Sequence, residues 1–125
     1  MEQTRKKILI IDDDAKHLLT TQELLENEGY DVFIHNIGFG ATNIIKNLQP
    51  DIILLDMNMP GLSGEKLTGL LKANRYTKDI PIVFYSSNDE SSLRQSVAES
   101  GIKGYICKGD IFNLREQVSF HLSSI

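Results

Sequence analysis

The sequence has a single cysteine, Cys107, among its 125 residues. One thiol cannot form an internal disulfide, so the fold does not depend on a disulfide framework. No apolar run approaches the roughly 18 residues of a transmembrane helix, and no apolar segment after Met1 resembles a secretory signal. These absences predict a cytoplasmic protein that does not insert into a membrane.

A clustered basic patch is also missing. The 13 Lys and Arg residues are scattered, and 17 acidic residues give a net charge of −4. A nucleic-acid surface normally carries clustered basic side chains, so we expect no nucleic-acid binding through this chain. The length and the absence of repeats, linkers or low-complexity segments predict one globular domain over residues 1–125.

Short apolar segments alternate with helical patterns along the chain. The segments typical of strands are 8–11, 32–34, 52–55, 81–85 and 105–107. Apolar residues at helical spacing follow each of them, around Leu18–Leu25, within 41–48, 67–71, 90–100 and 111–122, with Gly29 ending the first helix. We expect all these Leu and Ile stripes to lie in the core. Five such units predict an α/β fold with a parallel sheet and helices on both faces.

Polar residues gather where the predicted strands end. In parallel sheets, ligands bind beyond the carboxyl ends of the strands. The residues placed there are Asp12, Asp13, Asp14, Asp56, Ser86, Ser87 and Lys108. Ile52–Leu55 forms a buried run that ends on Asp56, and a buried carboxylate needs a partner.

The chemistry of this set favours phosphoryl transfer. Converging carboxylates repel one another unless a divalent cation neutralises them. Mg²⁺ prefers oxygen ligands and shares its coordination with phosphate groups. A lysine adds a positive charge, a serine hydroxyl can bond a phosphoryl oxygen, and an aspartate can act as the nucleophile.

Four segments together resemble the receiver domain of bacterial response regulators over almost the whole chain. They are KILIIDDD (7–14), PDIILLDMNMPGLSG (50–64), IPIVFYSSND (80–89) and GYICK (104–108). The resemblance implies a flavodoxin-like five-stranded sheet in the order 2-1-3-4-5. It also implies two-component signalling, in which a phosphoryl group passes from a phosphohistidine, or from a small phosphodonor, to an aspartate.

The resemblance assigns roles residue by residue. Asp56 corresponds to the phosphoacceptor, and the ligands of Mg²⁺ (or Mn²⁺) correspond to Asp12, Asp13, Asp56 and the backbone carbonyl of Asn58. Lys108 corresponds to the lysine of the site, Ser86 to the switch hydroxyl, and Tyr105 to the aromatic side chain that turns on activation.

The implied partners are a sensor histidine kinase or phosphotransfer protein and an output protein. The output protein would bind the fourth helix, fifth strand and fifth helix, and a phosphorylation-linked homodimer stays open. Such a domain promotes its own phosphorylation and dephosphorylation and is not an enzyme for a separate substrate.

Three other classes of protein compete with this interpretation. A phosphorylation-independent pseudo-receiver would be an interaction module, but the acidic, hydroxyl and lysine positions are intact. A flavodoxin-like electron carrier would need a phosphate loop in place of the three aspartates at 12–14. An aspartyl phosphatase would need a second acid soon after Asp56, where the chain has Met57 and Asn58.

Asp14 is expected to cap a helix, Cys107 to fill the core, and the histidines are assigned no chemistry.

Two positions depart from the family pattern. Gly109 replaces the usual proline, and Ser87 replaces the usual alanine. A cis bond costs roughly 2.5–4 kcal/mol before a residue other than proline, so we expect a trans Lys108–Gly109 bond. Glycine at a positive φ would then let the loop still direct Lys108 toward Asp56.

Overall fold

The computed structural model describes residues 5–36, 40–59, 61–87 and 89–123. A parallel sheet with strand order β2-β1-β3-β4-β5 runs through this part of the chain. Its strands are β1 (Lys7–Ile11), β2 (Asp31–His35), β3 (Ile52–Leu55), β4 (Ile82–Ser86) and β5 (Gly104–Cys107). The predicted fold class and strand order are therefore confirmed.

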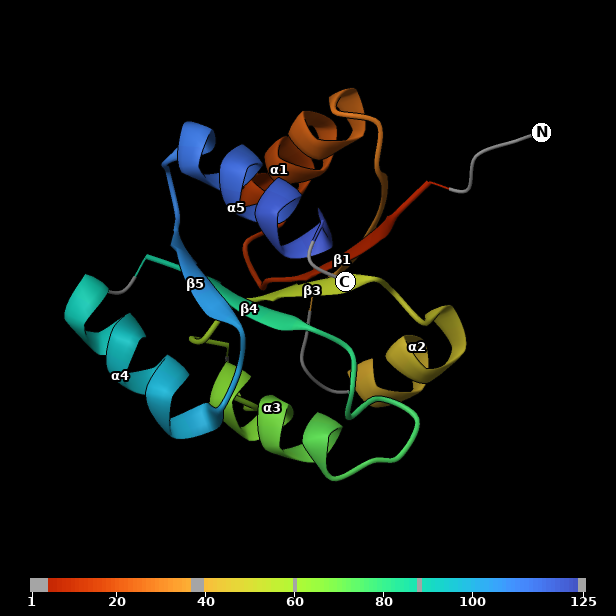
Figure 1. Cartoon of the computed structure of the whole chain (residues 1–125), viewed down its shortest axis with the longest axis vertical. Helices are drawn as coiled ribbons and strands as arrows, with labels where there is room; N and C mark the ends of the chain where they lie inside the picture. The colour runs from red at the N-terminus through yellow and green to blue at the C-terminus, as the bar shows by residue number, and fades with distance from the viewer. Residues whose placement is uncertain (1–4, 37–39, 60, 88, 124–125) are drawn as a thin grey trace.

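Helices cover both faces of the sheet. They are α1 (Ala15–Asn27), α2 (Ala41–Leu48), α3 (Gly64–Lys72), α4 (Glu90–Ser100) and α5 (Ile111–Ser123). Helices α1 and α5 lie on one face, and α2, α3 and α4 lie on the other (Figure 1). Among the described residues, no helix has both the length and the apolar character of a membrane span.

The core consists of two apolar layers because successive side chains of a strand point to opposite faces. On the α2, α3 and α4 side, Leu9, Ile53 and Phe84 are each at most 1% exposed. On the α1 and α5 side, Ile10, Leu54 and Ile106 are fully buried. Strands β1 and β3 are thus covered on both faces, which explains their continuous apolar sequences.

The apolar stripes of the helices are less buried than predicted. Leu19, Leu70 and Ile111 are 60%, 52% and 49% exposed, and Ile44 is 36% exposed. Helical spacing places these residues beside the inward-facing ones, but a neighbour in sequence lies about 100° around the helix axis. The prediction that all these stripes belong to the core was wrong for these four residues.

The helix ends near the site follow simple capping chemistry. Asp14 is the N-cap of α1, where its Oδ1 accepts the backbone N–H of His17 at 3.2 Å. This confirms the predicted capping role, and α1 therefore begins directly after the aspartates that follow β1. Gly29 has a φ of 97° and follows the end of α1, as predicted. Strand β4 begins at Ile82, one residue later than expected, so Pro81 precedes the strand.

Candidate acidic site

Asp12 and Asp56 lie side by side at the carboxyl edge of the sheet. They directly follow the neighbouring strands β1 and β3, and the Asp56 backbone N–H donates to the Ile11 carbonyl at 2.9 Å. Asp12 and Asp56 are only 1% and 4% exposed. The start of α3 closes against this edge, since the N–H of Gly64 donates to the Met57 carbonyl at 3.0 Å.

Three carboxylates form what we call the acidic cluster: Asp12, Asp13 and Asp56. One carboxylate oxygen from each lies within 4.8 Å of the other two. Asp13 is exposed, whereas the other two are buried, so the cluster opens to solvent on one side. Three oxygen donors that repel one another and face water fit a divalent cation such as Mg²⁺.

Lys108 connects two members of the acidic cluster. Its Nζ lies 2.8 Å from Oδ2 of Asp12 and 3.4 Å from Oδ2 of Asp56. The backbone at this point matches the expectation, since no peptide bond of the described residues is cis and Gly109 has a φ of 92°. The glycine therefore lets the loop turn while the lysine side chain reaches the cluster.

Burial and charge separate the pKa values of the two buried carboxyls. Burial is the main cause that raises the pKa of Asp56 to about 6; the Asn58 N–H and Lys108 act in the opposite direction, and the neighbouring Asp12 adds a smaller rise. Burial acts in the same direction on Asp12, but hydrogen bonds from Lys108 and from the Asp14 N–H hold its pKa below the ordinary value. Burial opposes the charge on Lys108, yet Asp12 and Asp56 raise its pKa. Asp12 and Lys108 thus form the stable ion pair, and Asp56 carries the less stable charge.

The remaining predicted residues are Asn58, which follows β3, and Ser86 and Ser87 at the end of β4. The backbone N–H of Asn58 donates to Oδ1 of Asp56 at 3.1 Å. Ser86 is fully buried at the end of β4, and its carbonyl accepts the Lys108 N–H at 2.9 Å. Ser87 is exposed. Residues 60 and 88 of the quoted motifs lie outside the described residues.

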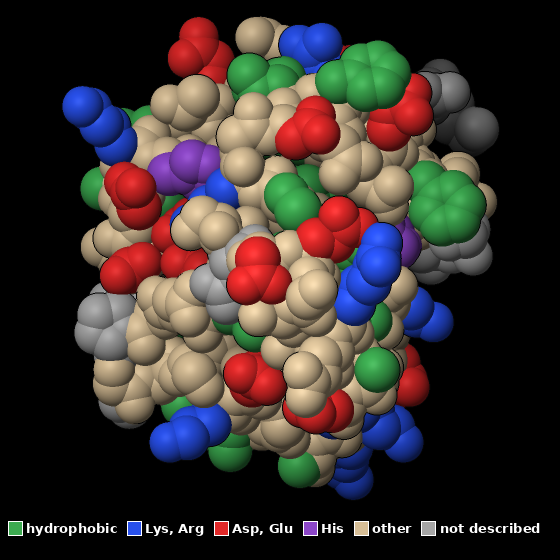
Figure 2. All heavy atoms as spheres, turned by 90° about the vertical axis from the view of Figure 1, so that its left-hand side faces the viewer, with side chains coloured by type: hydrophobic (Ala, Val, Ile, Leu, Met, Phe, Trp, Pro, Cys, Tyr) green, Lys and Arg blue, Asp and Glu red, His purple; other side chains and the backbone are tan. Residues whose placement is uncertain are grey.

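Tyr105 lies on β5, on the face of the sheet that α4 covers, and its side chain contacts α4. Its hydroxyl donates to Oε1 of Glu90 at 2.8 Å and accepts from Nε of Arg94 at 3.2 Å, both on α4. The ring lines a groove of about 620 Å³ between α4, β5 and α5, together with the half-buried Cys107 and the buried His121. Figure 2 faces this side of the molecule and shows acidic side chains across it, with apolar side chains between them.

His17 contacts the acidic cluster, although sequence reasoning assigned it no chemistry. Its Nδ1 lies 3.1 Å from Oδ2 of Asp12, and its Nε2 lies 3.3 Å from the hydroxyl of Tyr85. Two signals pointed to these contacts. His17 falls in the first turn of the helix that follows the aspartates, and Tyr85 directly precedes Ser86.

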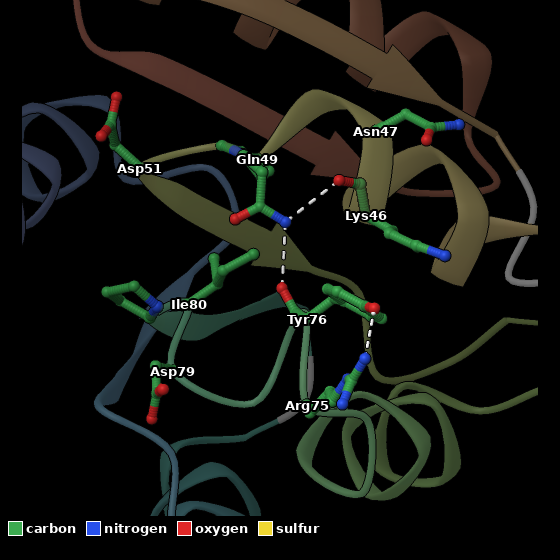
Figure 3. Close-up of a pocket in the computed structure, with 10 residues that line it drawn as sticks. Lys46, Asn47, Gln49, Asp51, Arg75, Tyr76, Asp79 and Ile80 are labelled. Carbon is green, nitrogen blue, oxygen red and sulfur yellow. Dashed lines mark hydrogen bonds between the residues drawn. The ribbon is translucent and has the colours of Figure 1, made fainter.

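A second hollow, of about 660 Å³, lies at the opposite edge of the sheet. Figure 3 shows its polar lining, in which Gln49 Nε2 donates to the carbonyls of Lys46 and Tyr76 at 3.0 and 2.9 Å. Arg75 donates to the Tyr76 hydroxyl at 2.7 Å. Its cations, Lys46 and Arg75, share the lining with Asp51 and Asp79. Because this edge holds the amino ends of the strands, we assign it no part in the site.

Comparison with known proteins identifies the family. A sequence model of the response regulator receiver domain matches residues 8–119, and the chain therefore belongs to this family. The DNA-binding response regulator MtrA of Mycobacterium tuberculosis is 32% identical over 108 residues, which cover 86% of this chain and 46% of MtrA. The sensor protein GacS of Pseudomonas syringae pv. syringae is 30% identical over 105 residues, which cover 82% of this chain and 12% of GacS. The chain thus spans less than half the length of these curated relatives.

Solved structures agree with the fold. A CheY-like receiver domain protein from Methanospirillum hungatei superposes with a TM-score of 0.85 at 25% identity, covering 97% of this chain and 96% of that one. The receiver domain of a sensor histidine kinase from Pseudomonas aeruginosa has a TM-score of 0.85 at 21% identity, covering 96% and 99%. That structure contains a magnesium ion coordinated in its active-site cleft.

Proposed function

We propose that the chain is a phosphorylation-controlled receiver in which Asp56 accepts a phosphoryl group. The donor is a phosphohistidine of a sensor histidine kinase or phosphotransfer protein, or a small phosphodonor. One observation carries the proposal: a buried carboxylate, Asp56, lies within one site with two further carboxylates and the ammonium of Lys108. Residues 1–125 would act as one such domain, in the cytoplasm.

Apart from the Asp56 nucleophile, the protein contributes to phosphoryl transfer mainly by positioning groups and stabilising charge. A carboxylate oxygen of Asp56 forms a bond to phosphorus while the bond from phosphorus to the donor imidazole nitrogen breaks, and the released imidazole takes up a proton. With a pKa of about 6, Asp56 is mostly ionised at neutral pH and able to attack. Lys108, at 3.4 Å from Asp56, can move its positive charge to the phosphoryl oxygens, where charge stabilisation counts most.

The acidic cluster would hold Mg²⁺ or Mn²⁺ through Asp12, Asp13, Asp56 and the backbone carbonyl of Asn58. Receiver domains bind Mg²⁺ at an acidic pocket, and the three converging carboxylates fit this chemistry. When bound, the ion supplies positive charge that offsets the carboxylates and the incoming phosphoryl group. The chain's own part is to orient the carboxylates, and the backbone N–H of Asn58 does this for Asp56.

Ser86 and Tyr105 would convert phosphorylation into a change of surface. Ser86 ends β4, the strand that pairs with the β3 strand preceding Asp56, and its hydroxyl would bond a phosphoryl oxygen. Tyr105 is held outward by Glu90 and Arg94, and it would turn inward in the modified state. The groove between α4, β5 and α5 would then present a changed face to an output protein or to a second copy of the chain. Hydrolysis of the acyl phosphate by water resets the switch.

The alternative is a pseudo-receiver whose surface binds a partner without phosphorylation. Labelled acetyl phosphate with and without Mg²⁺ separates the two functions. We expect Mg²⁺-dependent label on the wild type, none on Asp56→Asn, and much less on Asp13→Ala. Asp79→Asn, an exposed carboxylate at the opposite edge, is the matched control and should label normally. Unlabelled wild type under these conditions would favour the pseudo-receiver.

A further inference from the structure

His17 bridges the acidic cluster and the strand that carries Ser86. Its imidazole lies between Oδ2 of Asp12, at 3.1 Å from Nδ1, and the hydroxyl of Tyr85, at 3.3 Å from Nε2. The Tyr85 hydroxyl in turn lies 3.4 Å from Oγ1 of Thr21, one turn further along α1. Asp12, Thr21 and Tyr85 are at most 4% exposed, and the His17 side chain is 23% exposed. This chain of contacts is therefore largely shielded from water.

The hydrogen-bond directions in this chain follow from its carboxylate end. An ionised Asp12 only accepts, so Nδ1 of His17 must carry a proton to bond it. In a neutral ring, Nε2 then accepts the hydroxyl proton of Tyr85, and Thr21 donates to the Tyr85 oxygen. The contacts thus define one tautomer of His17, protonated on Nδ1.

His17 shares its carboxylate oxygen with the lysine of the site. Oδ2 of Asp12 lies 2.8 Å from Lys108 Nζ, while Oδ1 accepts the Asp14 N–H at 3.0 Å. If Lys108 moves toward a phosphoryl group on Asp56, Oδ2 of Asp12 loses its strongest donor. His17 still donates to that oxygen and keeps the carboxylate in place.

We propose that His17, held by Tyr85, is a positioning residue that orients Asp12 for the divalent cation. This inference rests on the proposed Mg²⁺-dependent function. A neutral His17 ring can orient the Asp12 carboxylate through a hydrogen bond. It does so without adding a second full positive charge beside that of Lys108, which would compete with the divalent cation. Hydrogen-bonding partners of metal ligands typically change metal affinity by about 10–100-fold when they are removed.

The test is calorimetric titration of the unphosphorylated protein with MgCl₂ at about pH 8, where an imidazole is ordinarily neutral. His17→Phe keeps a ring but removes both nitrogens, and it should weaken Mg²⁺ binding about tenfold. His17→Asn returns a donor near the place of Nδ1 and should restore most of the affinity. Tyr85→Phe removes only the hydroxyl and should fall between wild type and His17→Phe. Thr20→Ala changes an exposed residue of the same helix and should bind like the wild type.

A second measurement needs no variant. Nitrogen-15 NMR of the wild type at the same pH should show His17 protonated on Nδ1, the minor tautomer of free histidine. Equal Mg²⁺ affinity in wild type and His17→Phe, or a proton on Nε2, would overturn the positioning role. If His17→Phe does not fold, a Tyr85→Phe variant that binds Mg²⁺ as tightly as the wild type would overturn the positioning role in the same way. If the wild type itself binds no Mg²⁺, the proposed Mg²⁺-dependent function is wrong. This outcome differs from one in which the wild type binds Mg²⁺ and only the role of His17 is wrong.

Discussion

Asp56→Asn should stabilise the protein when no divalent cation is present. The folded state raises the pKa of Asp56 from 3.8 to about 6, which means that it favours the protonated carboxyl. The stabilisation from protonation is complete below the unfolded value of 3.8 and is lost as the pH rises through about 6. At about 1.4 kcal/mol per pKa unit, the loss amounts to about 3 kcal/mol at neutral pH. Asparagine stays neutral and avoids this loss.

Urea unfolding followed by far-ultraviolet circular dichroism measures the effect, since the chain has no tryptophan. With EDTA present, the free energy of unfolding of Asp56→Asn should exceed that of the wild type by about 3 kcal/mol near neutral pH and by little near pH 4. Asp79→Asn, an exposed carboxylate at the opposite edge, controls for the loss of one negative charge. If the difference in the free energy of unfolding between Asp56→Asn and the wild type does not grow with pH, the claim that the ionised Asp56 carboxylate destabilises the fold is refuted.

Three further substitutions probe the site from other sides. Ser86→Ala should still accept phosphate on Asp56, but phosphorylation should no longer strengthen partner binding; equal binding by phosphorylated wild type and variant would exclude Ser86 from the switch. Gly64→Ala should lower the free energy of unfolding by roughly 1–3 kcal/mol, because the added Cβ would meet the Asp56 carbonyl oxygen and lie 2.9 Å from Met57 Cα; an unchanged urea midpoint would contradict this contact. Gly109→Ala should cost about 1–2 kcal/mol, because φ is 92°, and full stability would show that the loop reroutes.

The sequence was enough to predict the sheet and the acidic edge because both depend on local patterns. Ile8–Ile11 and Ile52–Leu55 are continuous apolar runs, and only a central parallel strand buries such a run on both faces. The aspartates that follow these runs must then meet at one edge, and the structure places Asp12, Asp13 and Asp56 together. The trans bond and positive φ at Gly109 likewise followed from local backbone energetics.

The rest depended on contacts between distant parts of the chain. His17 and Tyr85 are 68 residues apart, so the sequence could indicate that each lies near the acidic edge but not that the two side chains form a hydrogen bond. The same limit explains Leu19 and Ile111, which have apolar spacing but lie outside the core. Periodicity defines the angle between residues on one helix, but the tertiary packing decides which of two adjacent residues faces inward.

The central claim is that Asp56 carries the phosphoryl group, and direct mapping of the modified residue tests it. After incubation with acetyl phosphate and Mg²⁺, borohydride reduction converts an aspartyl phosphate to homoserine, which peptide mass spectrometry locates. We predict homoserine at residue 56 in the wild type and at no position in Asp56→Asn. Homoserine at residue 12 or 13, or its appearance in Asp56→Asn, would contradict the assignment of the phosphoacceptor.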